Sequence, residues 1–147
     1  MTTTEAAAAP PECAFARAIL ARQGDCRLAT MRLQGEAQRP HCGSPVAYTN
    51  CRALRALLRE RSTFALRLPP PATALTHATE MRLQCGGLRG VAQALGDAPG
   101  PPADIHELVT RARDAFDGLL GIPYPVVVTA VASWEGRPRG AGGGSLP

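Results

Sequence analysis

The stretch that decides our expectation for this chain reads His41-Cys42-Gly43-Ser44-Pro45-Val46-Ala47-Tyr48-Thr49-Asn50-Cys51. Two cysteines flank a Gly-Ser-Pro turn, and the second lies near the start of an amphipathic helix. Cys26 lies upstream of this stretch, and Cys85 lies downstream in Gln84-Cys85-Gly86-Gly87-Leu88. Several cysteines together in a cytosolic chain more often indicate metal binding or redox chemistry than disulfides. The sequence therefore suggests a metal site formed by Cys26, Cys42, Cys51 and Cys85.

The start of this helix decides what Cys51 can do, and two starts fit the sequence. Either Ser44 caps the helix with Pro45 in its first turn, or Asn50 caps it. A cap at Asn50 favours a metal site, because helix N–H groups would then point at the Cys51 sulfur. A cap at Ser44 places Cys51 inside the helix among apolar residues, as an ordinary core cysteine.

The spacing of the four cysteines favours an iron–sulfur cluster over zinc. The gaps of 15, 8 and 33 residues contain no C-x-x-C pair, whereas structural zinc sites are usually built from such short-spaced pairs. The corners of a [4Fe-4S] cube accept thiolates from four separate elements. Gly43, Pro45 and Gly86 would shape the shell of the cluster by allowing sharp turns and close backbone approach. The alternatives are a zinc ion or no metal.

Two residues are possible substitute ligands. Cys13 lies among Ala and Phe and is expected to be a core residue, but it could replace one of the four cysteines. His41 could do the same if Cys26 is not a ligand. A separate feature is the row of Arg52, Arg55 and Arg59 on one face of the central helix, which we interpret as a possible contact for a partner.

The composition limits the class of protein. The chain has 147 residues, sixteen arginines, no lysine and a net charge of +4, a bias typical of GC-rich, bacterial-like coding. The arginines are dispersed, so a nucleic-acid-binding arm is not indicated. A redox partner or an acidic protein partner is more consistent with this pattern. There is no signal-like apolar segment near Met1 and no 18-residue apolar run, which predicts a cytoplasmic protein without a membrane span.

We expect a small, mainly helical α+β domain with one or two short strands, organised around the four-cysteine site. Residues 1–11 and 135–147 are predicted to be disordered tails, 12–95 a cysteine-bearing helical region, and 96–103 a Pro/Gly linker. Residues 104–134 form a helix–strand unit packed on that region. In it, Asp104 caps a helix with Glu107 in a capping box, and the β-branched run 125–134 is the strongest strand candidate.

The remaining elements are less regular. A first helix is expected from Pro11 to Gln23, and 26–33 is expected to be a short helix or an extended segment. A polar loop covers 34–40, a short strand or an extended end covers 64–68, and a helix over 74–84 ends at Cys85-Gly86-Gly87.

These features favour a small, non-enzymatic iron–sulfur protein that acts in electron transfer or as an accessory subunit. The first alternative is a protein-interaction module that is metal-free or stabilised by zinc. The second is a nucleic-acid-binding, redox-sensing regulator, in which a cluster would switch binding.

Overall fold

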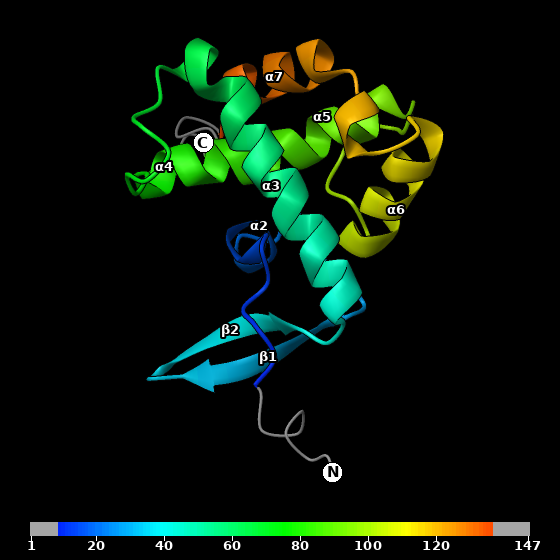
Figure 1. Ribbon diagram of the computed structural model, residues 1–147. Coiled ribbons are helices and arrows are strands. Elements are labelled where there is room, and N and C mark those ends of the chain that lie inside the picture. The colour runs from blue at the N-terminus through cyan, green and yellow to red at the C-terminus, as the bar shows by residue number, and fades with distance from the viewer. Residues whose placement is uncertain (1–8, 137–147) are drawn as a thin grey trace, which may run out of the picture.

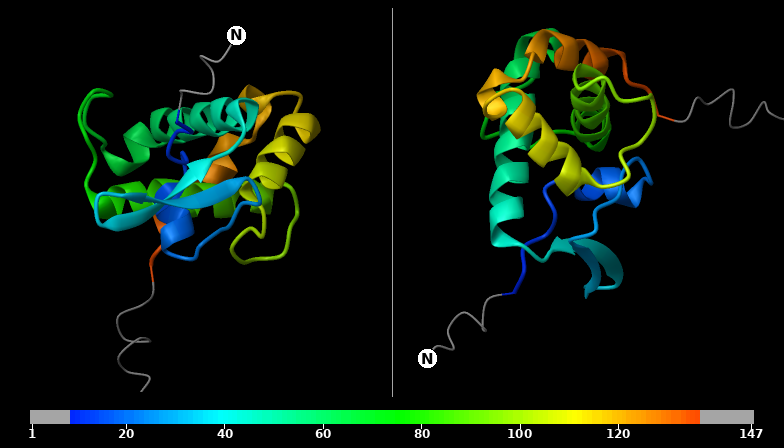
Figure 2. Two further views of the ribbon diagram at one scale, coloured as in Figure 1. Left: turned by 90° about the horizontal axis from the view of Figure 1, so that it is seen from below. Right: turned by 90° about the vertical axis from the view of Figure 1, so that its right-hand side faces the viewer.

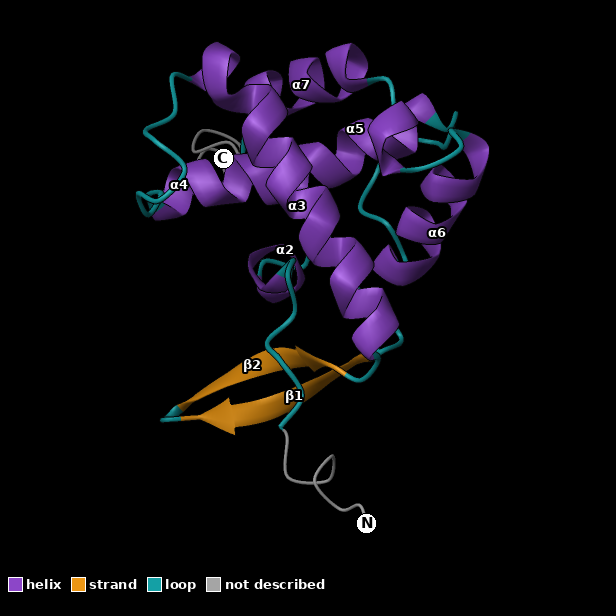
Figure 3. Cartoon of the chain, in the orientation of Figure 1, coloured by secondary structure: helices purple, strands orange, loops and turns teal. Residues whose placement is uncertain are grey.

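The computed structural model describes residues 9–136, and it has the α+β architecture expected from the sequence (Figure 1). Helices make up most of the domain, and a two-stranded antiparallel sheet lies at one end of it (Figure 3). The predicted tails fall largely on residues 1–8 and 137–147, which lie outside the described range.

The sheet is a hairpin of β1 (Ala29–Gln34) and β2 (Ala37–Cys42). Its register pairs Ala29 with Cys42 at the base and Gln34 with Ala37 at the tip. Gly35 has a φ of 68°, the left-handed conformation that a tight hairpin turn needs. The prediction of a polar loop over 34–40 was therefore wrong, while the extended alternative for 26–33 is confirmed from Ala29 onward. Pro40 lies within β2 although proline has no N–H for a ladder.

The N-terminal segment runs beside β2 instead of forming a helix. The N–H of Cys13 donates to Pro40 O at 2.9 Å, and the N–H of Cys42 donates to Pro11 O at 2.8 Å. The helix α2 spans only Ala16–Leu20, so the predicted helix from Pro11 to Gln23 was too long at both ends. Its first residues pair with β2 because their backbone groups find partners there.

The longest element is α3 (Pro45–Leu66), which runs from the hairpin to the opposite end of the domain (Figure 1). The Ser44 hydroxyl caps it by accepting the Ala47 N–H at 3.2 Å. This confirms Ser44, and not Asn50, as the cap. The strand predicted over 64–68 was wrong, because the helix continues to Leu66 and ends at Arg67 in the left-handed conformation. Of the alternating apolar residues, Leu66 and Leu68 are partly buried against the core, whereas the Phe64 side chain is 95% exposed.

A second long rod follows, made of three consecutive helical segments. They are α4 (His77–Met81), the π-helical turn η1 (Arg82–Gly86) and α5 (Gly87–Ala94). The helix predicted over 74–84 exists in part, but the predicted stop at Cys85-Gly86-Gly87 was wrong. Both glycines have helical dihedral angles. They do not end the helix; they leave room for the neighbouring helices α7 and α3, which lie too close for a side chain.

The chain ends in α6 (Ile105–Ala115), the 3₁₀ turn η2 (Leu119–Gly121) and α7 (Tyr124–Ser133). Asp104 stands at the N-cap position of α6 as predicted, yet its side chain makes no capping hydrogen bond. The strand predicted over 125–134 was wrong. Its valines form a helix because Tyr124, Val127 and Val131 share one face, and that face is buried.

The core lies where α3, α5, α6 and α7 meet (Figure 2). The contact between α5 and α7 is the most extensive one between helices. A Cβ at Gly90 would lie 2.7 Å from Val127 Cα, and one at Gly86 would lie 2.8 Å from Val131 Cα. Gly86 at the end of η1 and Gly90 in α5 therefore let the backbone of α7 approach the rod closely. The helix α2 packs between the rod and the hairpin, so the base of the hairpin is connected to the core.

Candidate cysteine site

Three of the four predicted ligands lie near one another, together with Cys13, where the base of the hairpin meets α3 and α6. We call Cys13, Cys26, Cys42 and Cys51 the N-terminal cysteine group. All four are free thiols. They come from four different segments, namely the N-terminal strand-like segment, the loop before β1, the end of β2 and the second turn of α3.

Backbone hydrogen bonds bring Cys13 and Cys42 together. These two residues flank the bridge between Glu12 and His41, with each donating its N–H across to the other segment. Cys42 is thus held on one side by the N-terminal segment and on the other by Ala29 of β1. Its thiol donates to Ser44 O at 3.3 Å.

The loop that carries Cys26 is anchored between the hairpin and the start of α6. The N–H of Ala29 donates to Cys26 O at 3.1 Å, and the N–H of Gly43 donates to Leu28 O at 2.9 Å. On the other side, the N–H of Ile105 donates to Asp25 O at 2.7 Å. The Asp104 carboxylate accepts the Arg27 N–H at 3.3 Å, so the side chain predicted to cap α6 binds this loop instead.

Cys51 lies inside α3 on the buried face that also carries Ala47 and Leu54. This is the setting in which the sequence predicts an ordinary core cysteine, and Cys51 does belong to the core cluster. Its face of the helix is also the one directed at the rest of the group. Cys51 is therefore a residue of the hydrophobic core and also a neighbour of the other thiols.

The charge of each thiolate contributes to the pKa of the neighbouring thiols. Burial, together with smaller contributions from the charges of Cys13, Cys26 and Cys42, raises the pKa of Cys51 to about 12. Burial likewise raises the pKa of Cys13 to about 11; the backbone N–H of Phe15 opposes this shift, and the charges of Cys26 and Cys42 contribute to it. The pKa of Cys26 is raised mainly by burial, while backbone N–H groups of Leu28 and His106 oppose that shift. In the metal-free protein these three thiols are therefore protonated at neutral pH.

Two helix N-termini border the group, and both favour negative charge beside them. Cys42 precedes the first residue of α3 by three positions. His106, whose N–H acts on Cys26, lies in the first turn of α6. Burial thus disfavours an isolated thiolate at this place. The two helix dipoles nevertheless stabilise an anionic group that is bound there.

Cys85, the fourth predicted ligand, lies apart from this group. It is fully buried in the π-helical turn η1. Burial raises its pKa to about 11, and the one charge that counters this effect belongs to Arg89. Cys13 occupies the place beside the other thiols that the sequence had assigned to Cys85.

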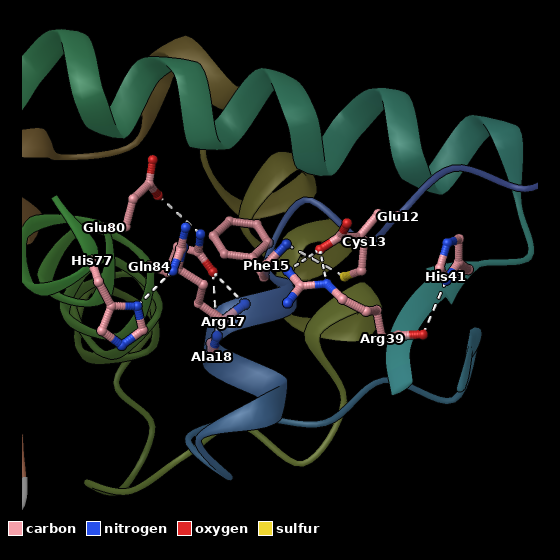
Figure 4. Close-up of polar contacts among 10 residues, drawn as sticks. All are labelled: Glu12, Cys13, Phe15, Arg17, Ala18, Arg39, His41, His77, Glu80 and Gln84. Atoms are coloured by element: carbon pink, nitrogen blue, oxygen red, sulfur yellow. Dashed lines mark hydrogen bonds and ion pairs between the residues drawn. The ribbon is translucent and has the colours of Figure 1, made fainter. Parts of the chain in front are cut away.

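The other predicted site residues are distributed between the two regions. Gly43 and Pro45 lie at the group, and a Cβ on Gly43 would lie 3.3 Å from Leu28 O. Gly86 faces α7 instead. His41 adjoins Cys42, but its Nδ1 lies 3.0 Å from the Arg39 carbonyl oxygen (Figure 4). Adjacent residues of a strand point to opposite faces, so His41 is directed away from the Cys42 side chain.

The three arginines predicted as a partner contact have different roles. Arg55 pairs with Glu80, and Arg59 donates to Pro70 O at 2.9 Å and to Thr73 O at 2.7 Å. The hydrogen bonds of Arg59 therefore hold the loop after α3 against the helix. Arg52 is exposed and forms no ion pair within residues 9–136.

Across residues 9–136, no three Cys, His, Asp or Glu side chains are arranged to hold a single metal ion. The organisation of the fold around a four-cysteine metal site thus remains a hypothesis. No helix in the described part of the chain is long and apolar enough to cross a membrane. No protein family, no curated protein and no solved structure matches this chain.

Proposed function

We propose that this protein is a small iron–sulfur protein, and that Cys13, Cys26, Cys42 and Cys51 ligate a [4Fe-4S] cluster used in electron transfer or in an accessory subunit. The observation that carries this proposal is the convergence of four free thiols from four segments on two helix N-termini. This set keeps three of the ligands expected from the sequence and replaces Cys85 with Cys13.

The origin of the four thiols in four separate segments favours a cluster over a single ion. The four thiolates of a zinc site lie about 3.8 Å apart, given Zn–S bonds of about 2.3 Å in a tetrahedron. A cube has one iron at each of four corners, so its ligands are farther apart. Four cysteines from four separate segments, without a C-x-x-C pair, are consistent with the larger group.

The protonation of the thiols bears on how a cluster would bind. Loading must release protons, since the ligands are thiolates and the pKa values of Cys13 and Cys51 are raised by burial. The dipoles of α3 and α6 would offset part of the cost of holding that charge in a partly buried place.

Anaerobic expression and purification with iron and sulfide analysis test this assignment. We expect brown protein with the broad visible absorption of thiolate-to-iron charge transfer and about four irons per chain. Cys13→Ala and Cys51→Ala should each lose most of the iron. Cys85→Ala should keep it, and it is the matched control because Cys85 is buried away from the group.

Three results would overturn the assignment. Loss of iron in Cys85→Ala with retention in Cys13→Ala would return Cys85 to the ligand set. Colourless protein with about one zinc per chain would replace the cluster by a zinc site. Colourless protein without metal would remove the metal function altogether. Circular dichroism of each variant would separate ligand loss from failure to fold.

A further inference from the structure

A polar cavity of about 420 Å³ lies beside the N-terminal cysteine group, between the N-terminal segment, β2, α3 and the rod of α4 and η1. We call it the arginine pocket. Its charged lining residues are Glu12, Arg17, Arg39, Arg52, Arg55 and Glu80. Four guanidinium groups thus face two carboxylates, which leaves a formal excess of two positive charges in one concave site.

The two carboxylates are already engaged. Glu12 accepts from the Nε of Arg39 at 2.9 Å and also pairs with its terminal guanidinium nitrogen (Figure 4). Glu80 pairs with Arg55 across the pocket. These ion pairs hold Arg39 and Arg55 in place. They leave the charges of Arg17 and Arg52 available to attract a ligand.

The two other arginines can meet an incoming anion. The guanidinium of Arg17 contacts Nδ1 of His77, and Arg52 extends from the exposed side of α3. Neither forms an ion pair with a carboxylate within residues 9–136. An arginine beside such a cavity presents a planar fork of N–H donors, whose geometry matches carboxylate and phosphate oxygens.

One wall of the pocket is rigid and buried. Oε1 of Gln84 accepts the N–H groups of Arg17 and Ala18 at 3.1 and 3.2 Å (Figure 4). The Nε2 of Gln84 donates to Oε1 of Glu80 at 3.0 Å, and both side chains are nearly inaccessible to solvent. This network fixes the backbone that carries Arg17 and the carboxylate that holds Arg55. The site is therefore organised before any ligand arrives.

We infer that the arginine pocket binds a small oxyanion, a carboxylate or a phosphate, with Arg17 and Arg52 as its principal contacts. The inference stands on these contacts alone and goes beyond the proposed metal function. Since Cys13 also lines the cavity, the bound anion would lie next to the cysteine group. The ligand class follows from the excess charge and from the donor geometry of arginine.

Isothermal titration of the purified full-length chain with inorganic phosphate and with succinate, in low-salt buffer without other oxyanions, tests the inference. We expect saturable binding of at least one probe at one site per chain. Arg52→Gln and Arg17→Gln should each weaken it about tenfold, as expected for the loss of a hydrogen bond to a charged group. Arg113→Gln, an exposed arginine in the last turn of α6, should change it less than twofold.

The two probes assign the source of the oxyanion, because preference for phosphate or for succinate identifies the group recognised. Equal weakening by Arg52→Gln and Arg113→Gln would overturn the inference, since it would show a response to net charge alone. Absence of saturable binding for both probes would overturn it as well. Neither result depends on metal content, so the proposed iron–sulfur function is tested separately.

Discussion

At the scale of single residues, the least expected feature is the buried polar pair of Gln84 and Glu80. Polar residues in a helix are usually exposed, and nothing in the local sequence distinguishes these two. Their burial follows from tertiary contacts, because Gln84 satisfies two N–H groups at the start of α2 that otherwise would have no partner. A buried polar side chain of this kind is retained because both of its ends are hydrogen-bonded.

Replacing Gln84 by leucine should destabilise the protein by about 1–3 kcal/mol, because the N–H groups of Arg17 and Ala18 lose their acceptor inside the protein. Urea unfolding monitored by circular dichroism measures this effect. Gln93→Leu is the matched control, since Gln93 is an exposed residue of α5. Equal stability of the Gln84 and Gln93 variants would mean that the hydrogen bonds of Gln84 contribute nothing net.

The cysteines illustrate what single residues can reveal before a structure exists. Their number drew attention to Cys26, Cys42 and Cys51, and the charges of Cys26 and Cys42 contribute to the raised pKa of Cys51. Cys13 was placed in a helix because Pro11 and Glu12 resemble a first turn. The adjacent Pro10-Pro11 pair was the contrary signal, since a residue before proline favours extended backbone. An extended segment pairs with β2 and carries Cys13 to the others.

At the scale of elements, the helices with a clear apolar stripe were predictable and the β-branched segment was not. The body of α3 and most of α6 follow the expected 3.6-residue period. The run Val126-Val127-Val128 has high strand propensity, yet it forms α7 because packing against α5 decides its conformation. Strand propensity mainly measures how well a residue packs in a sheet, and within residues 9–136 no sheet lies at this end of the molecule.

A bidentate ion pair joins the loop after α5 to α6, and its contribution to the stability of the protein depends on pH. Arg111 donates to both carboxylate oxygens of Asp97, at 2.9 and 2.8 Å, and this hydrogen bonding lowers the pKa of Asp97. A lowered pKa in the folded state adds stability above the unfolded pKa of about 3.9, and that stability disappears as the pH falls through the folded value.

Asp97→Asn should therefore lower the melting temperature at pH 7, and the difference from the wild type should shrink as the pH falls below about 4. Thermal melts between neutral and acidic pH measure the trend. Asp114→Asn, on the exposed face of α6, provides the control and should show no such pH-dependent difference. A difference for Asp97→Asn that is constant with pH would contradict the role assigned to the ion pair.

At the scale of the whole molecule, the two ends of the domain are stabilised differently. The end formed by α5 and α7 is closely packed and belongs to the core. The hairpin has mostly exposed residues on β1 and is attached through its base. An isolated two-stranded hairpin is marginally stable in water. The N-terminal cysteine group lies at this base. A cross-link between the segments there would stabilise the hairpin end more than the closely packed end.

Loading the protein with its proposed cluster should slow amide hydrogen exchange at the base of the hairpin much more than in α5 and α7. The expected sites are the amides of Cys13, Ala29, Cys42 and Gly43, which close the segments around the thiols. Hydrogen exchange measured by mass spectrometry on metal-free and loaded protein tests this. Equal protection throughout the chain, or none at the hairpin, would contradict a local cross-link.

The contact between α5 and α7 has a consequence for how this sequence can change over evolutionary time. The atoms that exclude a side chain at Gly86 and Gly90 include the backbone of α7, with Val131 Cα and Val127 Cα nearest. A smaller residue on α7 cannot relieve a clash with its own backbone, so no second substitution there compensates for a first one at either glycine. The two positions are therefore expected to stay glycine in any descendant that keeps this helix pair, while the exposed positions of β1 are free to change.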